Sequence, residues 1–253
     1  MQGFGLLLRK ELTEMMRTRR LPVVLIVFTL LGLVSPVVAR YIKEIVTAAG
    51  GTGLEAAIPE PVAGDAVRQL TRNLGQFGTF IAILIAMGSV AGEKERGTAV
   101  FLLTKPIGRD AFLAAKVAAL GLLLALATAL AGAACWFYTA VLFEPLPLAG
   151  FVAAVALLWL SLAAFAAITF AASVLAPSAL VAGGIGVAAL LLGGFLSVIT
   201  SIAPYLPTGL WGLADELAIG NLPDPLIGPL VVDVAIIGLA LALAWWSFRR
   251  QEL

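Results

Sequence analysis

Long apolar stretches constrain the fold of this chain more than any other feature of its sequence. They recur along its 253 residues, and no Lys or Arg occurs between Lys116 and Arg249. Only 12% of the residues are charged, whereas a soluble domain has about a quarter. Apolar stretches of roughly 20 residues match the hydrocarbon core of a bilayer. The sequence therefore predicts an all-α polytopic membrane protein.

Six transmembrane helices are expected, and together they form a single domain over residues 1–253. The expected spans cover residues 21–39, 74–91, 111–143, 148–175, 179–199 and 226–248. The third stretch exceeds the roughly 20 residues that a bilayer core requires. This helix is therefore expected to tilt, to protrude from the membrane or to break near residues 131–138.

The distribution of positive charge predicts the orientation. Of the 16 Lys and Arg residues, the outer connections hold Arg40, Lys43, Arg68 and Arg72, and the other twelve flank the spans on the opposite side. Cytoplasmic loops carry the excess of Lys and Arg in multi-pass proteins. Both termini are therefore predicted to lie in the cytoplasm.

Three segments outside the spans have compositions of their own. Residues 1–20 form an amphipathic segment, either an elbow helix lying against membrane lipids or an ordinary positively charged flank. Residues 40–73 form an outer loop that contains an amphipathic stretch. The outer segment 200–226 is too interrupted by proline to span and too apolar for a solvated loop, so it predicts short re-entrant or interfacial helices.

The connection over residues 92–110 contains an apolar run between charges. Thr98 is a suitable N-cap and Pro106 a stop, which predicts a helix of fewer than about ten residues. Such a helix is not stable alone in water, so its apolar residues require a partner surface. That surface is either another protein or the lipid and bundle of the chain itself.

The sequence of this connection, "GEKERGTAVFLLTKPIGRDAFLAAK" over residues 92–116, resembles the signature of ABC-2-type ABC transporter permeases, especially the NosY-like branch. The matching positions are Glu93, Glu95, Gly97, Thr98, Leu102, Leu103, Pro106, Arg109 and Lys116. The resemblance implies a cytoplasmic coupling helix that docks on an ATPase. Its expected coupling residues are Glu93, Glu95, Arg96, Gly97, Thr98, Phe101, Leu102, Leu103, Pro106 and Arg109.

The same resemblance implies the partners. They are two copies of a cytoplasmic ABC ATPase, a second copy of this chain and membrane lipids, in a cell (cytoplasmic) membrane. The sequence contains no G-x-x-x-x-G-K-[ST] motif, so a nucleotide site is expected on another chain, with ATP and Mg bound there. With no His and one Cys, no catalytic residue, cofactor site or metal site is expected here, and no nucleic-acid partner.

Four residues are candidates for the substrate pathway or a dimer interface. Gly184 and Ala188 lie four apart, as do Gly193 and Ser197, and small residues at this spacing let helices approach closely. Packing within one bundle explains the spacing equally well. Asp233 lies in the sixth span, where a carboxylate is a functional candidate, although hydration near the outer interface would also account for it.

These features predict the permease subunit of an ATP-driven exporter that does no covalent chemistry. Two alternatives stay open. A secondary transporter driven by an ion gradient commonly shows two related halves and acidic groups at mid-membrane, and neither is evident here. A non-transporting subunit that recruits another protein would share the docking helix.

Overall fold

The computed structural model describes residues 3–50, 58–95, 97 and 108–251, and these residues form helices and no strands. The long helices are α2 (Arg20–Arg40), α8 (Arg109–Leu142), α9 (Leu148–Leu175), α10 (Ala179–Leu196) and α12 (Ile227–Arg250). The shorter ones are α1 (Phe4–Arg17), α3 (Ile42–Ala48), α4 (Ala63–Asn73), α5 (Thr79–Met87), α6 (Ala91–Glu95) and α11 (Gly209–Ala218), with a π-helix at Leu74–Gly78 and a 3₁₀ turn at Ala203–Tyr205.

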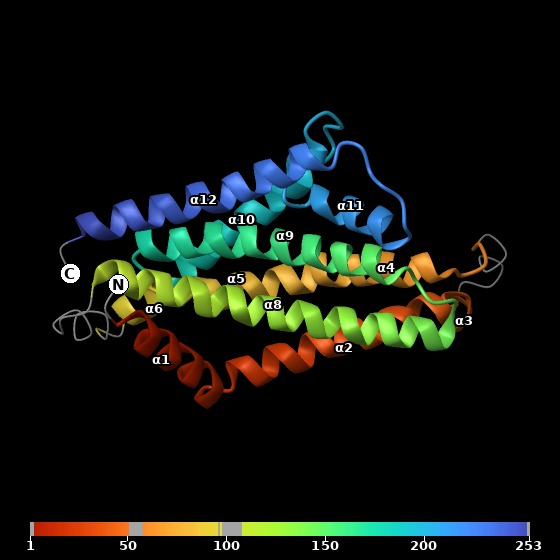
Figure 1. The fold of residues 1–253 in the computed structure, drawn as a ribbon, viewed down its shortest axis with the longest axis horizontal. Helices are drawn as coiled ribbons and strands as arrows, with labels where there is room; N and C mark the ends of the chain where they lie inside the picture. Colours follow the sequence, from red (N-terminus) through yellow and green to blue (C-terminus); the bar gives the residue numbers. More distant parts are fainter. Residues whose placement is uncertain (1–2, 51–57, 96, 98–107, 252–253) are drawn as a thin grey trace.

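The long helices run side by side along one axis, and both ends of the chain lie at the same end of the bundle (Figure 1). This terminal end also holds α1, α6 and the start of α8, whereas α3 and the start of α4 lie at the opposite end. Within the described ranges, six helical segments are long and apolar enough to cross a membrane, which confirms the predicted multi-pass architecture.

The span boundaries in the structure agree with the predicted ones except at the start of the second span. This span begins at Ala63 rather than near residue 74, because α4, the π-helix and α5 follow one another without a break. Residues Ala66, Val67 and Leu70 of α4 are buried, so its apolar face belongs to the bundle. The third span is one unbroken helix, Arg109–Leu142, so of the three expected alternatives, tilting, protruding or breaking near residues 131–138, the break does not occur.

Helix α9 forms the centre of the bundle. It packs against α5, α8, α10, α11 and α12. Of its most apolar stretch, 56% is buried inside the bundle, whereas for the most apolar stretch of α12 the value is 17%. A helix that is apolar on all sides is expected at such a position. Close backbone approach joins α2 to α8: a Cβ on Gly32 would lie 2.2 Å from the carbonyl oxygen of Ala131.

The first two helices meet at a sharp corner at the terminal end. Arg19 has a φ of 58°, in the left-handed region, and separates α1 from α2. This corner directs α1 back against α8 (Figure 1). Within the predicted outer segment 200–226, the 3₁₀ turn and α11 form the expected short helices.

Candidate functional site

The site is built around α6, the five-residue helix that precedes the connection at residues 96–107. Its start is held by Ser173 of α9. The Ser173 hydroxyl oxygen accepts hydrogen bonds from the backbone N–H groups of Val90 at 3.1 Å and Ala91 at 2.9 Å, and the hydroxyl donates to the Met87 carbonyl at 2.7 Å. The turn between α5 and α6 is thereby fixed against the most buried span.

Glu93 of α6 forms a buried ion pair with one other helix and a partly buried ion pair with a second. Its Oε1 lies 2.8 Å from Nζ of Lys116 in α8 and 3.4 Å from Nζ of Lys10 in α1. Lys116 also lies 3.2 Å from Oε1 of Glu11 in α1. Side-chain exposure is 4% for Lys116 and 6% for Glu93. These contacts join three helices at a point with little access to water.

Five residues make up this ion cluster: Lys10, Glu11, Glu14, Glu93 and Lys116. Burial alone would lower the pKa of Lys10, but the neighbouring glutamates outweigh it and raise the pKa above 10.5. For Glu14, burial is outweighed by Lys10, and the pKa falls below 4.5. Buried charges are tolerated when they are paired in this way.

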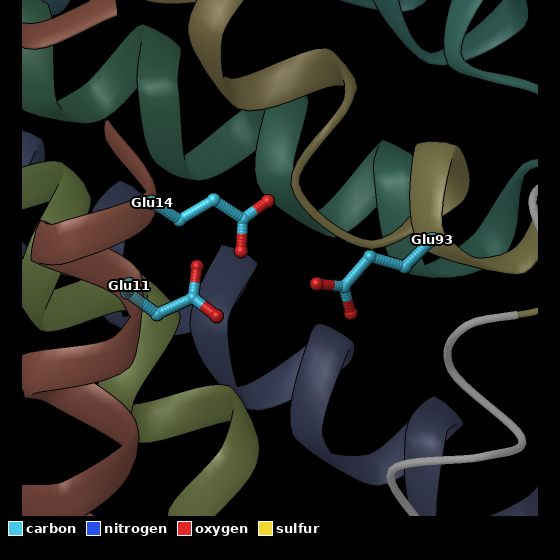
Figure 2. A group of neighbouring side chains, drawn as sticks. All are labelled: Glu11, Glu14 and Glu93. Carbon is cyan, nitrogen blue, oxygen red and sulfur yellow. The ribbon is translucent and has the colours of Figure 1, made fainter. Parts of the chain in front are cut away.

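The three glutamates of the cluster point toward a shared space, with Glu11 and Glu14 coming from α1 and Glu93 from α6 (Figure 2). One oxygen from each lies within 4.8 Å of the others, the arrangement that could hold a metal ion. The ammonium groups of Lys10 and Lys116 already lie against these carboxylates. Among the described residues, these five side chains therefore form an internal ion-pair network.

The next two residues of α6 contact different elements. Nζ of Lys94 donates to the carbonyl of Val174 at 2.5 Å and to Oε1 of Gln251 at 2.6 Å. Oε1 of Glu95 accepts a hydrogen bond from the backbone N–H of Ala179 at 3.2 Å, at the first turn of α10. Through three consecutive charged residues, α6 thus contacts α1, α8, α9, α10 and the segment that follows α12.

The far end of the connection is also anchored. Nη1 of Arg109, the first residue of α8, donates to the carbonyls of Arg249 at 3.2 Å and Gln251 at 3.0 Å. Both ends of residues 96–107 are therefore attached to the bundle.

Of the expected coupling residues, the structure places four at these two ends: Glu93, Glu95, Gly97 and Arg109. The others, Arg96, Thr98, Phe101, Leu102, Leu103 and Pro106, lie outside the described residues. Sequence reasoning identified Lys116 through the resemblance but missed Glu11 and Gln251. Lys116 is followed in α8 only by uncharged residues, and a lysine at the edge of such a long apolar stretch is the signal that could have indicated an acidic partner elsewhere.

The four candidate pathway or interface residues do not come together. Gly184 and Ala188 lie on the exposed face of α10, whereas Gly193 is buried next to Thr208 and Phe165. Asp233 is 1% exposed, and neither of its carboxyl oxygens has a hydrogen-bond partner among the described residues. Gly193 therefore packs within this bundle. Of the four candidates, Gly184 and Ala188 are the ones that another molecule could contact.

Comparison with known proteins identifies the family. The family model described as "ABC-2 family transporter protein" matches residues 6–214, most of the chain. The chain belongs to the ABC-2 family of transporter proteins. It is 24% identical to an uncharacterised transmembrane protein, YxlG, of Bacillus subtilis, with 97% of each chain covered.

Two further relatives carry a functional name. This chain is 36% identical to the probable ABC transporter permease protein NosY of Pseudomonas aeruginosa over 124 residues, which cover 47% of this chain and 39% of that protein. Identity is 35% over 123 residues to the protein of the same name from Stutzerimonas stutzeri, with the same coverage. Members of the ABC-2 family are membrane subunits, and separate ATPase chains hydrolyse the ATP. The chain is thus a multi-pass transmembrane subunit of an ABC transporter, not itself an ATPase, and its family implies a cytoplasmic ABC ATPase as partner.

Proposed function

We propose that this chain is the permease subunit of an ABC exporter and that residues 92–110 form its coupling segment. The anchoring of α6 carries the proposal. Three consecutive charged residues connect the start of this segment to five other parts of the bundle, two of them through the buried ion cluster. A movement imposed on the segment by an ATPase would be passed to α1 and α8 together.

In this proposal, the terminal end faces the cytoplasm, where ATP and Mg bind to two ATPase copies. ATP binding draws the two ATPases together, and the coupling segments move with them. The spans then shift between inward-facing and outward-facing arrangements, because nucleotide binds the two states with different affinity. Helix α1, with Leu6 and Met16 exposed, would lie against lipid as an elbow.

The proposed substrate pathway lies between two copies of the chain. The outer face of α10 supports this arrangement, since a Cβ on Gly184 would meet no atom within 4 Å and the large neighbours Val181 and Ile185 are exposed. A small residue on an open apolar face lets a second helix approach closely. Asp233, whose carboxyl group has no hydrogen-bond partner within the part of the chain that the structure describes, is the acidic residue that we assign to the pathway.

Affinity purification of the tagged chain from native membranes tests the partnership. The test variant carries Leu102→Asp and Leu103→Asp, and the matched control carries Leu222→Asp, at a position that is 85% exposed near the opposite end. We expect a Walker-A ATPase to co-purify with the wild type and the control and to be lost from the test variant. Retention by all three would show that the segment is not the principal contact. Absence from all three would favour the gradient-driven carrier or the recruiting subunit.

The mass of the purified chain in detergent tests the pairing. Gly184→Leu adds bulk to the proposed interface, and Gly238→Leu adds the same bulk to α12 at a glycine that also meets no atom within 4 Å. We expect only the first change to convert dimer to monomer. A monomeric wild type, or a dimer that tolerates both changes, would contradict the proposed use of α10.

A further inference from the structure

We propose that Gln251 is a positioning residue through which the coupling segment moves α12. This inference rests on the proposed function and adds a second connection, separate from the ion cluster. It concerns the carboxyl-terminal anchor, which we define as Gln251 with its partners Lys94, Arg109 and Val174.

Gln251 contacts both ends of the coupling segment at once. Its Oε1 accepts a hydrogen bond from Nζ of Lys94 at 2.6 Å, ahead of residues 96–107. Its backbone carbonyl accepts from Nη1 of Arg109 at 3.0 Å, behind them. Because the donors come from α6 and α8, any displacement that the two ends share also displaces Gln251.

A third bond fixes the side chain of Gln251 in place. Nε2 donates to the carbonyl of Val174 at the end of α9, at 3.0 Å, and the same carbonyl accepts from Lys94. A primary amide suits this position because it offers an acceptor to an ammonium group and a donor to a carbonyl. Leucine could provide neither bond, and glutamate could not donate to Val174.

The last turns of α12 are tied to the first turn of α8 as well. Asp110 accepts hydrogen bonds from Nε1 of Trp245 at 2.8 Å and from Nη2 of Arg249 at 2.9 Å. Along the rest of its length, α12 packs mainly on α9 and is the least buried of the six spans. It is therefore held by hydrogen bonds at the terminal end and by packing on one main neighbour, α9, along the rest of its length, and in this proposal it tilts on α9 as a lever.

The lever extends from the terminal end toward the connection from α11 (Figure 1). Helix α12 is continuous from Ile227 to Arg250, and its first residues follow the connection from α11 (Figure 1). A rigid helix of 24 residues transmits a tilt over its whole length. Movement of the coupling segment would thus change the position of the outer end of α12 without passing through the ion cluster.

Distance measurements between spin labels test this inference in the complex of the full chain with its ATPase. Labels are placed at Phe137→Cys in α8 and Val231→Cys in α12, both exposed, and unlabelled chain is added in excess to suppress distances between copies. Native Cys135 is 0% exposed, so the introduced thiols label selectively. We expect ATP with vanadate to change the α8–α12 distance in the otherwise wild-type chain.

The variants separate the anchor from the remainder of the site. We expect Gln251→Leu to retain the ATPase and nucleotide binding but to reduce the ATP-dependent distance change, because the side-chain bonds to Lys94 and Val174 are lost while those of Arg109 and Asp110 to the end of α12 remain. Lys94→Met removes the same link from the other side, should have the same effect, and decides the question if Gln251→Leu does not accumulate. Arg250→Ala is the control: this neighbouring guanidinium lies 4.0 Å from the Trp246 ring centre, and its loss should leave the change intact.

Two other results would contradict the role that we propose for the carboxyl-terminal anchor. An unchanged distance in the wild-type background would show that α12 does not move, and a full change in Gln251→Leu would show that it moves without the anchor. Both results leave the permease assignment standing, provided that the ATPase co-purifies. Failure of the ATPase to bind the wild-type chain would instead contradict the proposed function itself.

Discussion

The two ends of the bundle use charge in different ways. At the terminal end, the side chains of Lys116 and Glu93 are 4% and 6% exposed and their pair joins separate helices. At the opposite end, Lys43 pairs with Glu60 at 2.7 Å, but the Glu60 side chain is 86% exposed. A buried pair carries a large desolvation cost and gives little net stability, whereas an exposed pair costs little and contributes little. The difference indicates that the terminal end uses its charges to fix relative positions.

At the opposite end, helices are joined by hydrogen bonds in which at most one of the two groups is charged. Helix α11 is attached to α9 by Nε1 of Trp211, which donates to Oγ of Ser161 at 2.9 Å. It is attached to α4 by the Thr71 hydroxyl, which donates to Oδ1 of Asp215 at 2.6 Å. Each of these polar contacts is a single bond, and it adds to the apolar packing of α11 on the two helices. The opposite end should therefore respond to substitutions in small, independent steps.

The largest effect is expected from Lys116→Met. Removing this ammonium leaves Glu11 and Glu93 buried with Lys10 as the remaining cluster cation, and loss of one partner from a buried pair typically costs about 3–5 kcal/mol. Lys43→Met, the matched change at the opposite end, should cost less than about 1 kcal/mol. Reversible unfolding in detergent gives both values. A similar loss of unfolding free energy in both variants would contradict the distinction between the buried and the exposed ion pair.

A second prediction concerns the simultaneous replacement of the three most buried charges of the ion cluster. Lys116→Met combined with Glu11→Gln and Glu93→Gln removes the uncompensated charges, so most of the lost stability should return. The same triple variant should nevertheless uncouple ATP hydrolysis from movement of the spans, because α1, α6 and α8 lose their connection. Stability and coupling restored together would mean that the ion cluster serves only the fold.

A smaller effect is expected from Trp211→Phe. The ring still packs, but the hydrogen bond to Ser161 is lost and its buried hydroxyl loses a donor, which typically costs about 1 kcal/mol. The coupling energy between Trp211→Phe and Ser161→Ala in a double-mutant cycle measures the bond directly. A cost as large as that of Lys116→Met would contradict the view of separate, weak attachments.

The smallest effect is expected from Asp215→Asn. Burial raises the pKa of the Asp215 carboxyl above 3.8, although Thr71 opposes the shift by its hydrogen bond. Since the folded-state pKa exceeds the unfolded value, stability should rise as the pH falls through the folded pKa toward 3.8. The amide variant should lack this rise and match the wild type at neutral pH within about 1 kcal/mol. Unfolding curves from neutral to acidic pH compare the two.

The spans could be predicted from the sequence because their signal is local. Span length and composition placed α9 at the residues where the structure has it. The predicted start of the second span was wrong because Arg68 and Arg72 make the sequence of α4 look polar, while the buried face of α4 carries few large residues. Likewise, α10 carries small residues on two faces. Close contacts within the chain are made by Gly183, which lies against Met87, and by Gly186, which lies against Thr169 and Ile83, but not by Gly184.

The ion cluster could not be predicted because its contacts are remote in sequence. Glu11 lies 105 positions from Lys116, and Lys10 lies 83 positions from Glu93. A single sequence contains no signal that pairs residues over such separations. The resemblance supplied Lys116 and Glu93 as motif positions, but without their partners. Gln251 was missed for the same reason, since a glutamine after a final span resembles any polar flank.

The order of synthesis gives the carboxyl-terminal anchor a further consequence. Gln251 bonds to Lys94, a residue made 157 positions earlier, and chains are built from the amino terminus. Until α12 has entered the membrane, Lys94 and Arg109 lack this partner and the ends of the coupling segment are attached only through the earlier elements. The anchor thus closes last, and the terminal end reaches its final form only in chains whose six spans are all in place.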